Sequence, residues 1–256
     1  MAEQLTLDLP AREALGRDAF FVAPSNMLAL ATLDATETWP SGKLVLIGPA
    51  GAGKTHMAQV WANDRGAVIL ASADLAEADI PALAARRFVV VEDADRLPDL
   101  PDARAAEEAL FHLHNLTLAE GGRLLLTACT APNRWALSLP DLASRMQGTT
   151  VAHIEPPDDM LLTVLLVKQF EDRQLIVPEH LITWLVKRME RSAAAARDIV
   201  EALDREALRA GCRPIWRGAT GLGRVWPPSV SRRRGAGLVP CGRGRCWIKL
   251  RTPCRL

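Results

Sequence analysis

One octapeptide constrains this chain more than any other feature. Residues 48–55 read GPAGAGKT and fit the pattern G-x-x-x-x-G-K-[S/T] without a mismatch. The apolar run Lys43–Ile47 precedes the octapeptide and a helical pattern, His56–Asp64, follows it. A strand, a glycine-rich loop and a helix in this order direct backbone N–H groups and a helix N-terminus at one anion. A glycine-rich turn that binds nothing is the alternative, but this context favours a phosphate-binding loop.

The residue types of the octapeptide suit a nucleotide. Its glycines allow close backbone approach and positive φ angles. Lys54 is expected to reach the β- and γ-phosphates, and the Thr55 hydroxyl to hold Mg²⁺. We therefore predict that the chain binds a purine nucleotide, ATP or ADP with Mg²⁺. The predicted binding residues are Gly48, Pro49, Ala50, Gly51, Ala52, Gly53, Lys54 and Thr55.

Two carboxylates end a second apolar run. Phe88–Val91 is followed directly by Glu92 and Asp93. A buried strand that ends in acids is the partner that a phosphate-binding loop requires, so we assign Glu92 to the Mg²⁺ shell and Asp93 to polarising the attacking water. The alternative is an ordinary strand end with solvated acids, which the nearby loop disfavours.

Short apolar runs alternate with longer amphipathic stretches over residues 25–156, a pattern typical of a parallel α/β sheet. Ser25 could cap the first helix through its hydroxyl. We expect strands at Lys43–Ile47, Ala67–Leu70, Phe88–Val91, Leu124–Thr127 and Thr150–Ile154. We expect helices near Ser25–Asp34, Thr55–Asp64, Ala103–Glu120 and Pro140–Met146.

Three further segments flank this α/β domain. Residues 1–24 form an N-terminal arm. After the stiff pair Pro156-Pro157, residues 157–210 show helical periodicity only and predict a small all-α module. Its helices are expected at Asp158–Asp172, Pro178–Arg188 and Ser192–Ala210. Residues 211–256 form a tail.

The tail differs in composition from the rest of the chain. Residues 1–210 carry a net charge of −10, whereas residues 211–256 carry +11 and no acid. A basic arm with tryptophans for base stacking is one interpretation. The other, which we favour because no helical or strand period persists, is unstructured sequence of the kind that a shifted reading frame in GC-rich DNA produces.

Other sequence features argue against a membrane protein, a secreted protein, DNA binding by residues 1–210 and a zinc site. No stretch approaches the ~20 apolar residues of a membrane span, and the N-terminus lacks the features of a signal peptide, so we expect a cytoplasmic location. The acidic body argues against a direct grip on DNA. His112 and His114 are spaced i, i+2, on different sides of a helix, and are interpreted as structural or solvated rather than zinc ligands.

Several stretches together resemble a known family. Phe21–Asn26 (FVAPSN), the loop followed by His56 (GKTH) and the strand VVVEDADR are similar to the AAA+ domain of the DnaA family, and more closely to its shorter Hda proteins, which carry regulatory inactivation of DnaA. The similarity covers roughly residues 4–210. It implies a P-loop AAA+ core with a five-stranded parallel sheet and a small all-α lid, and it places Phe21–Asn26 against adenine.

The resemblance extends to a short predicted helix that contains an arginine. Asp141–Met146 (DLASRM) resembles the family's box VII, whose arginine reaches the γ-phosphate of a neighbouring subunit. Arg145 is therefore expected to act catalytically in trans, because a guanidinium stabilises charge on the transferred phosphoryl group. The alternative is a surface arginine in a salt bridge.

Two nucleotide-sensing positions follow from the same resemblance. The stretch AAARDIVE is similar to the sensor 2 helix of the lid and places Arg197 over the nucleotide. Thr127 ends the fourth predicted strand, where the family keeps a polar sensor 1, but Thr130 or Cys129 could serve instead.

The N-terminal stretch QLTLDLP resembles the sliding-clamp-binding motif of Hda proteins. A glutamine amide would bond in a small pocket while leucines fill an apolar groove. The implied partner is the β sliding clamp of DNA polymerase III, and the alternative is a frayed first strand. The predicted clamp-binding residues are Gln4, Leu5, Leu7 and Leu9.

Three functions remain in view. The resemblance implies a regulator of replication initiation that, bound to the clamp, stimulates hydrolysis of DnaA-bound ATP. Glu92 stands where relatives usually have aspartate, so weak ATP turnover by the chain itself is expected, and a homo-oligomer is also allowed. A self-contained AAA+ ATPase that remodels or loads another protein is the alternative. A nucleic-acid-binding protein acting through the tail is the third.

Overall fold

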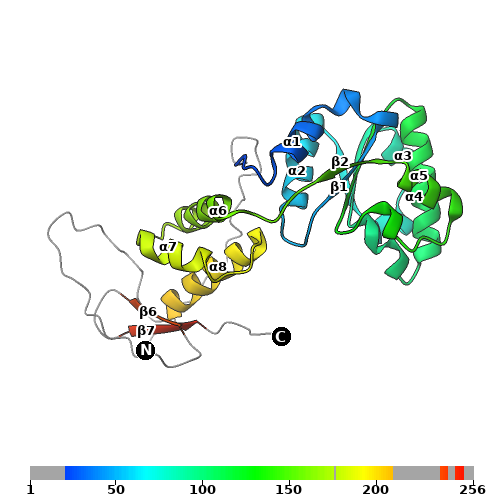
Figure 1. Cartoon of the computed structure of the whole chain (residues 1–256). Coiled ribbons are helices and arrows are strands. Elements are labelled where there is room, and N and C mark those ends of the chain that lie inside the picture. Colours follow the sequence, from blue (N-terminus) through cyan, green and yellow to red (C-terminus); the bar gives the residue numbers. More distant parts are fainter. Residues whose placement is uncertain (1–20, 176, 210–236, 242–245, 251–256) are drawn as a thin grey trace. The chain divides into compact units, whose positions relative to one another are not determined.

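The computed structural model describes residues 21–175, 177–209, 237–241 and 246–250. The chain divides into two compact units between Pro156 and Pro157. The first unit contains a sheet with helices on both faces, and the second contains packed helices (Figure 1).

The sheet of the first unit has five parallel strands. They are β1 Lys43–Ile47, β2 Val68–Ala71, β3 Phe88–Glu92, β4 Arg123–Ala128 and β5 Thr150–His153. Their order in the sheet is β2-β3-β4-β1-β5, so β1 lies between β4 and β5. The predicted five-stranded parallel sheet is confirmed, and every strand end falls within one residue of its prediction.

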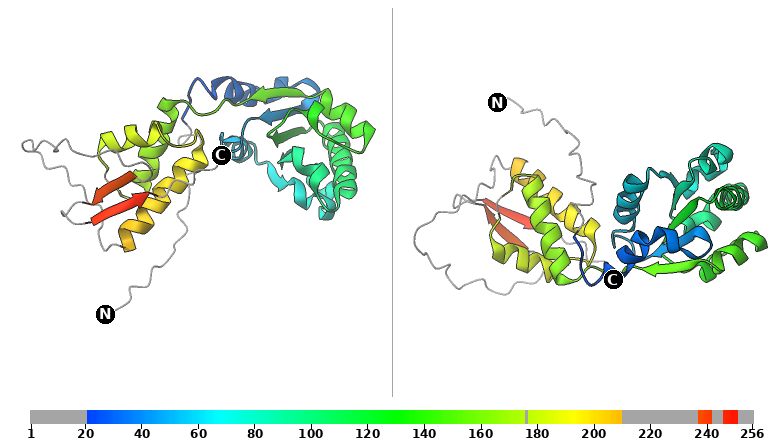
Figure 2. Two further views of the ribbon diagram at one scale, coloured as in Figure 1. Left: turned by 60° about the horizontal axis from the view of Figure 1, so that its bottom comes forward. Right: turned by 90° about the horizontal axis from the view of Figure 1, so that it is seen from above.

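Helices cover both faces of this sheet (Figure 2). They are α1 Met27–Asp34, α2 Lys54–Arg65, α3 Ile80–Ala84, α4 Ala103–Ala119 and α5 Pro140–Gln147. Side chains alternate along β1, so Leu44 and Leu46 pack with α1 and α2, while Val45 and Ile47 pack with α3, α4 and α5. Burial on both faces explains why the strands are nearly continuous apolar runs. The short α3 was not predicted.

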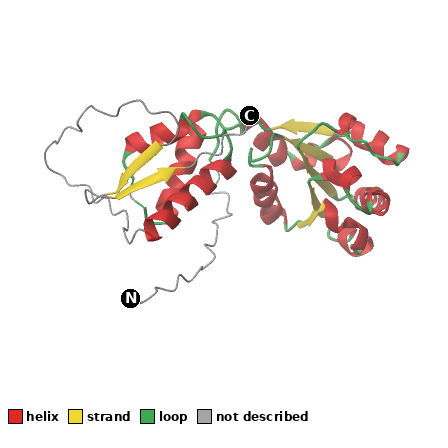
Figure 3. Ribbon diagram, turned by 90° about the horizontal axis from the view of Figure 1, so that it is seen from below, coloured by secondary structure: helices red, strands yellow, loops and turns green. Residues whose placement is uncertain are grey.

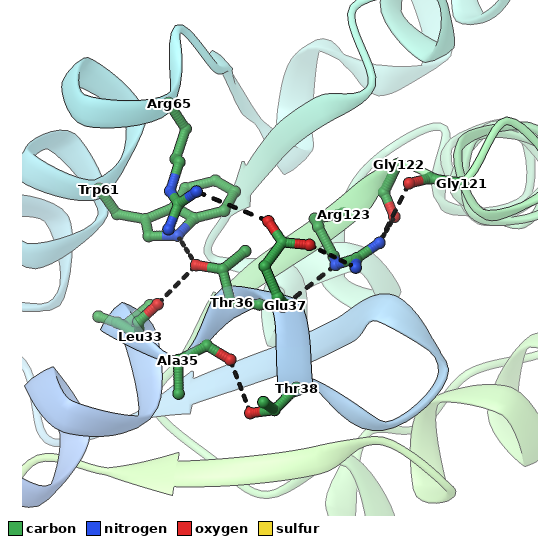
Figure 4. Close-up of polar contacts among 10 residues, drawn as sticks. All are labelled: Leu33, Ala35, Thr36, Glu37, Thr38, Trp61, Arg65, Gly121, Gly122 and Arg123. Atoms are coloured by element: carbon green, nitrogen blue, oxygen red, sulfur yellow. Dashed lines mark hydrogen bonds and ion pairs between the residues drawn. The ribbon is translucent and has the colours of Figure 1, made fainter.

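A polar cluster fastens α2 to the segment before β1 (Figure 4). Trp61 Nε1 donates to the buried Thr36 Oγ1 at 2.9 Å. The Glu37 carboxylate lies 3.6 Å from Arg65 Nη1 and 2.9 Å from Arg123 Nη2, so it bridges α2 and β4. Because α2 begins directly after the glycine-rich loop, these contacts hold the far end of the helix whose N-terminus forms the candidate site.

The second unit contains α6 Asp159–Asp172, α7 Glu179–Val186 and α8 Ala193–Arg209 (Figure 3). Ser192 caps α8, since its Oγ accepts the N–H of Ala195 at 3.0 Å. Of the helices that the structure describes, none has the length and apolar character to cross a membrane. The core of the unit is formed by Leu162, Leu166, Phe170, Ile182, Leu185, Val186, Ala196, Val200 and Leu203.

The predicted cap of the first helix is wrong. Helix α1 begins at Met27, after Asn26, and the buried Ser25 Oγ has no hydrogen-bond partner among the described residues. Asn26 orders this turn instead: its Oδ1 accepts the N–H of Ala23 at 2.9 Å and its Nδ2 donates to the carbonyl of Phe21 at 3.0 Å. The asparagine side chain therefore satisfies two backbone groups of this turn.

Within the tail, the structure describes two short stretches. Two described stretches, β6 Gly237–Cys241 and β7 Cys246–Leu250, pair antiparallel, with Val239 opposite Ile248. Their valine, isoleucine and tryptophan residues favour strands. The prediction of an unstructured tail rested on the composition of the whole segment, and it stays a prediction.

Candidate nucleotide-binding site

The loop of residues 48–53 joins the carboxyl end of β1 to α2. Gly51 and Gly53 have φ angles of 73° and 101°, which glycine adopts without strain. A Cβ atom at Gly48 would lie 2.9 Å from the carbonyl oxygen of Ile154, so the backbone there leaves no room for a side chain. A tight glycine-rich path that leads into a helix N-terminus is the backbone arrangement that binds a phosphate group.

The ammonium group of Lys54, the first residue of α2, turns back toward this loop. Its Nζ donates to the carbonyl oxygens of Gly48 at 2.7 Å and Pro49 at 3.0 Å, and lies 3.4 Å from Cys129 Sγ. Lys54 is only 8% exposed. Carbonyl and thiol contacts do not neutralise its buried charge, so the position favours an anion such as phosphate. Thr55, the next residue, is exposed on the first turn of α2.

Glu92 ends β3 at the sheet edge from which the loop leaves. Val91 pairs with Leu126, and Leu126 pairs with Val45, so β3 and β1 end at a similar level. The Oε1 atom of Glu92 is buried and has no hydrogen-bond partner among the described residues. An unpaired buried carboxylate oxygen costs stability, and the hydration shell of Mg²⁺ would supply its partner.

The residues at this edge therefore fit Mg²⁺, with Thr55 and Glu92 as the residues that would hold it. The described part of the chain contains no group of three or more His, Cys, Asp or Glu side chains suited to a metal ion. Few protein ligands are needed, because Mg²⁺ at nucleotide sites keeps several waters and binds phosphate oxygens. When bound, the ion would neutralise charge on those phosphates.

Asp93 presents its carboxylate from a fixed backbone. Its φ and ψ angles of 54° and 43° are left-handed. Its N–H donates to Thr127 Oγ1 at 3.1 Å, and its carbonyl oxygen accepts from Ser72 Oγ at 3.0 Å. The exposed carboxylate is therefore held at the end of β3 while its backbone groups are engaged.

The three candidates for a sensor at the end of β4 have different partners. Thr127 bonds the backbone beyond β3. Asp95 Oδ2 accepts from the N–H groups of Cys129 and Thr130 at 2.9 and 3.0 Å, and from Thr130 Oγ1 at 3.2 Å. Of the three side chains, that of Cys129 contacts Lys54. Reasoning from the sequence missed the anchoring role of Asp95, although its place in the acidic run EDAD was a usable signal.

Arg145 lies at the opposite edge of the sheet. Its carbonyl oxygen accepts from Lys43 Nζ at 2.6 Å, and Lys43 is the first residue of β1. At about 3.3 Å per strand residue, roughly 16 Å separates the backbone of Lys43 from that of Gly48. The Arg145 side chain is exposed, with its guanidinium carbon 5.3 Å from the centroid of the Phe111 ring. The structure thus does not bring Arg145 to the loop of its own chain.

The other predicted residues are placed elsewhere. Arg197 is exposed on α8, in the second unit, and its role over the nucleotide stays a prediction. The two histidines are consistent with a structural or solvated interpretation: His112 is exposed, and His114 is buried 3.4 Å from Lys43 Nζ. The predicted clamp-binding residues lie outside the described part of the chain: Gln4, Leu5, Leu7 and Leu9.

A curated protein and several solved structures are similar to this chain. No family model matches the chain. The chromosomal replication initiator protein DnaA of Sphingopyxis alaskensis is 29% identical over 222 residues, or 78% of this chain and 48% of that protein, so the chain spans about half the length of this relative.

Solved structures show the fold. Domain III of the Thermotoga maritima replication initiation protein DnaA gives a TM-score of 0.63 at 19% identity and covers 79% of this chain and 92% of that one. AMPPCP-bound DnaA from Aquifex aeolicus gives 0.62 at 16% identity, with coverage of 78% and 67%. The fold is the α/β P-loop AAA+ fold, and the sequence is DnaA-like.

Proposed function

We propose that this DnaA-like AAA+ chain is a nucleotide-binding regulator of replication initiation that stimulates hydrolysis of DnaA-bound ATP. In this proposal it binds ATP or ADP with Mg²⁺ at residues 48–55, attaches to the β sliding clamp through its N-terminal motif, and supplies Arg145 to the nucleotide of DnaA. This is the role of the Hda proteins that the sequence resembles. The observation that carries the proposal is the position of Arg145.

Nucleotide binding is supported by charge at the loop. The buried ammonium of Lys54 lies among neutral groups, and the unpaired Glu92 Oε1 suits the water shell of a metal ion. The AMPPCP-bound DnaA structure, which shares the fold, supports a nucleoside triphosphate as the ligand class.

Action in trans is supported by the distance between Arg145 and the loop. Arg145 lies at the amino edge of the sheet and the loop at the carboxyl edge, and the guanidinium is exposed to a partner. Hydrolysis forms a bond from a water oxygen to the γ-phosphorus and breaks the bond from that phosphorus to the β–γ bridging oxygen, giving ADP and phosphate. An added guanidinium donates N–H bonds to the oxygens that gain charge, an effect worth on the order of 10³–10⁵ in rate for arginine fingers.

The second candidate function is a self-contained ATPase, which the two acidic residues at the carboxyl edge of the sheet favour. Glu92 and Asp93 are adjacent at the end of β3, and Asp93 has a fixed backbone and an exposed carboxylate. This candidate requires steady ATP turnover by the chain alone, which Asp93→Asn would abolish.

The proposal is tested with DnaA preloaded with radiolabelled ATP, mixed with this protein and clamp-loaded DNA. We expect clamp-dependent conversion to ADP that is lost in Arg145→Ala and in Gln4→Ala. Conversion that both variants retain would overturn the proposal. If conversion is lost only in Arg145→Ala, the role of Arg145 stands and the role of the N-terminal clamp-binding motif is overturned.

A further inference from the structure

Helix α5, which carries Arg145, is held at its N-terminus by a buried carboxylate. Glu107 is 1% exposed on α4. Its Oε1 accepts the N–H of Ser138 at 3.0 Å, and its Oε2 accepts the Ser138 hydroxyl at 2.9 Å and the Leu139 N–H at 2.8 Å. Leu139 directly precedes Pro140, the first residue of α5, and Ser138 is the residue before Leu139. A carboxylate there satisfies donors at the helix start and complements its dipole.

The C-terminus of α5 is held by a buried cation. Lys43 is 6% exposed, and its Nζ donates to the carbonyl oxygen of Arg145, one of the last-turn carbonyls without a helical partner. The Thr149 hydroxyl donates to the same oxygen at 3.0 Å. Two donors therefore fix the backbone of Arg145 while its side chain stays exposed.

His114 supports this cation from α4. Its Nε2 lies 3.4 Å from Lys43 Nζ, and its Nδ1 lies 3.1 Å from Asn115 Oδ1. Burial lowers the pKa of His114, which leaves the imidazole neutral and Nε2 able to accept from the ammonium. Glu107 and His114 are seven residues apart on α4 and so lie on one face of that helix.

We propose that Glu107 and Lys43 are positioning residues that hold the two ends of α5 and thereby fix Arg145 for its partner's nucleotide. The inference rests on the proposed function, because Arg145 must be the residue that acts in trans. Neither residue touches that nucleotide in this proposal. Both act through the backbone of α5.

The kinetic test measures conversion of DnaA-bound ATP against the concentration of this protein, with clamp-loaded DNA. We expect Glu107→Gln and Lys43→Met each to lower the maximal rate on the order of tenfold or more, because small misplacements of a positioned group are costly. The half-saturating concentration and the protein's own affinity for ATP stay unchanged. Glu108→Gln, at the adjacent exposed glutamate paired with Arg104, is the matched control and keeps the parent rate.

A coupling test separates positioning from general damage. In an Arg145→Ala background, Glu107→Gln and Lys43→Met are expected to cause no further fall, because they act through the missing side chain. A further fall, or a maximal rate equal to that of Glu108→Gln in the single variants, would overturn the inference. Since the two end contacts are independent, either variant that keeps the parent's ATP affinity is sufficient to decide the test.

Hydrogen–deuterium exchange tests whether the two end contacts hold α5, in the full chain and without DnaA. Glu107→Gln is expected to speed amide exchange in residues 140–147 and Glu108→Gln is not. Unchanged exchange in Glu107→Gln and Lys43→Met would overturn the inference that these residues hold α5, even if Arg145 proves essential. Suppose instead that exchange is faster in these two variants but Arg145→Ala still stimulates hydrolysis. The contacts that hold α5 would then stand, and the proposed function would be overturned.

Discussion

The backbone N–H of Asp93 donates to the hydroxyl oxygen of Thr127 at 3.1 Å and so joins the ends of β3 and β4. Thr127 is 1% exposed, and Asp93 has a left-handed backbone. A buried threonine thus fixes the residue that we assign to polarising water, and the same contact links local stability to the proposed chemistry.

Replacing this hydroxyl tests its structural role. Thr127→Val keeps the shape of the side chain but leaves the Asp93 N–H without its acceptor, which we expect to lower the free energy of unfolding by about 1–3 kcal/mol. Urea unfolding measures the difference. Thr38→Val, at an exposed threonine, is the control and should lie within about 0.5 kcal/mol of the parent. Equal losses in the two variants would contradict this role.

Removing the buried cation of the loop tests nucleotide binding. We expect Lys54→Met to weaken ATP binding by roughly 10- to 100-fold, because a hydrogen bond to a charged group contributes about 1.5–3 kcal/mol. Isothermal titration calorimetry measures the affinity, with Lys187→Met, at an exposed lysine of the second unit, as the control. Parent affinity in Lys54→Met would show that this residue does not contact the phosphates.

The unpaired oxygen of Glu92 gives a prediction about Mg²⁺. Glu92→Gln should bind ATP as the parent does without Mg²⁺ but gain less affinity when Mg²⁺ is added, because an amide interacts more weakly with the ion's water shell. Titrations with and without the metal measure this difference, and Glu120→Gln, at an exposed position of the chain, is the control. The same gain in both variants would remove Glu92 from the metal site.

His114 gives a prediction about pH. Burial, the largest cause, and the nearby cations of Lys43 and Arg145 lower its pKa from the usual 6.5, while the hydrogen bond to Asn115 opposes them. Below pH 6.5 the unfolded chain therefore binds more protons than the folded chain, and stability falls as the pH drops toward the folded pKa. Urea unfolding from pH 7.5 down to 5 should show a steeper loss in the parent than in His114→Gln.

The neighbouring histidine provides the control for this pH series. His112→Gln changes an exposed side chain on the same helix and should keep the pH dependence of the parent. If the free energy of unfolding falls with pH in the same way in the parent and in His114→Gln, His114 is not the group responsible for the loss of stability.

The strands were predictable from the sequence because both faces of the sheet are buried. Each strand is a nearly continuous apolar run, so its ends are marked by polar residues or, after β1, by glycine and proline. Helix ends were harder: both Ser25 and Asn26 have capping side chains, and only the fold shows that Asn26 reaches Ala23 and Phe21. The order of the strands in the sheet does not follow from periodicity, because each buried strand has the same apolar pattern.

The loop residues of the candidate site were predictable because they are contiguous. Contacts between distant segments were not, such as Lys54 with Cys129 and Lys43 with Arg145, which depend on how the strands are ordered. Glu107 left a signal that we did not use: it is an acid beside Ala106 on the apolar stripe of its helix, which indicates a buried partner.

In the proposed mechanism, Arg145 acts on a nucleotide held by another protein. The most direct measurement loads DnaA with ATP labelled at the γ-phosphate, loads this protein with a non-hydrolysable ATP analogue, and follows release of labelled phosphate in the presence of clamp-loaded DNA. We expect rapid release with the parent and with Arg134→Ala, at another exposed arginine, and slow release with Arg145→Ala. Equal release with both variants, or release only when this protein carries hydrolysable ATP, would contradict the action of Arg145 in trans.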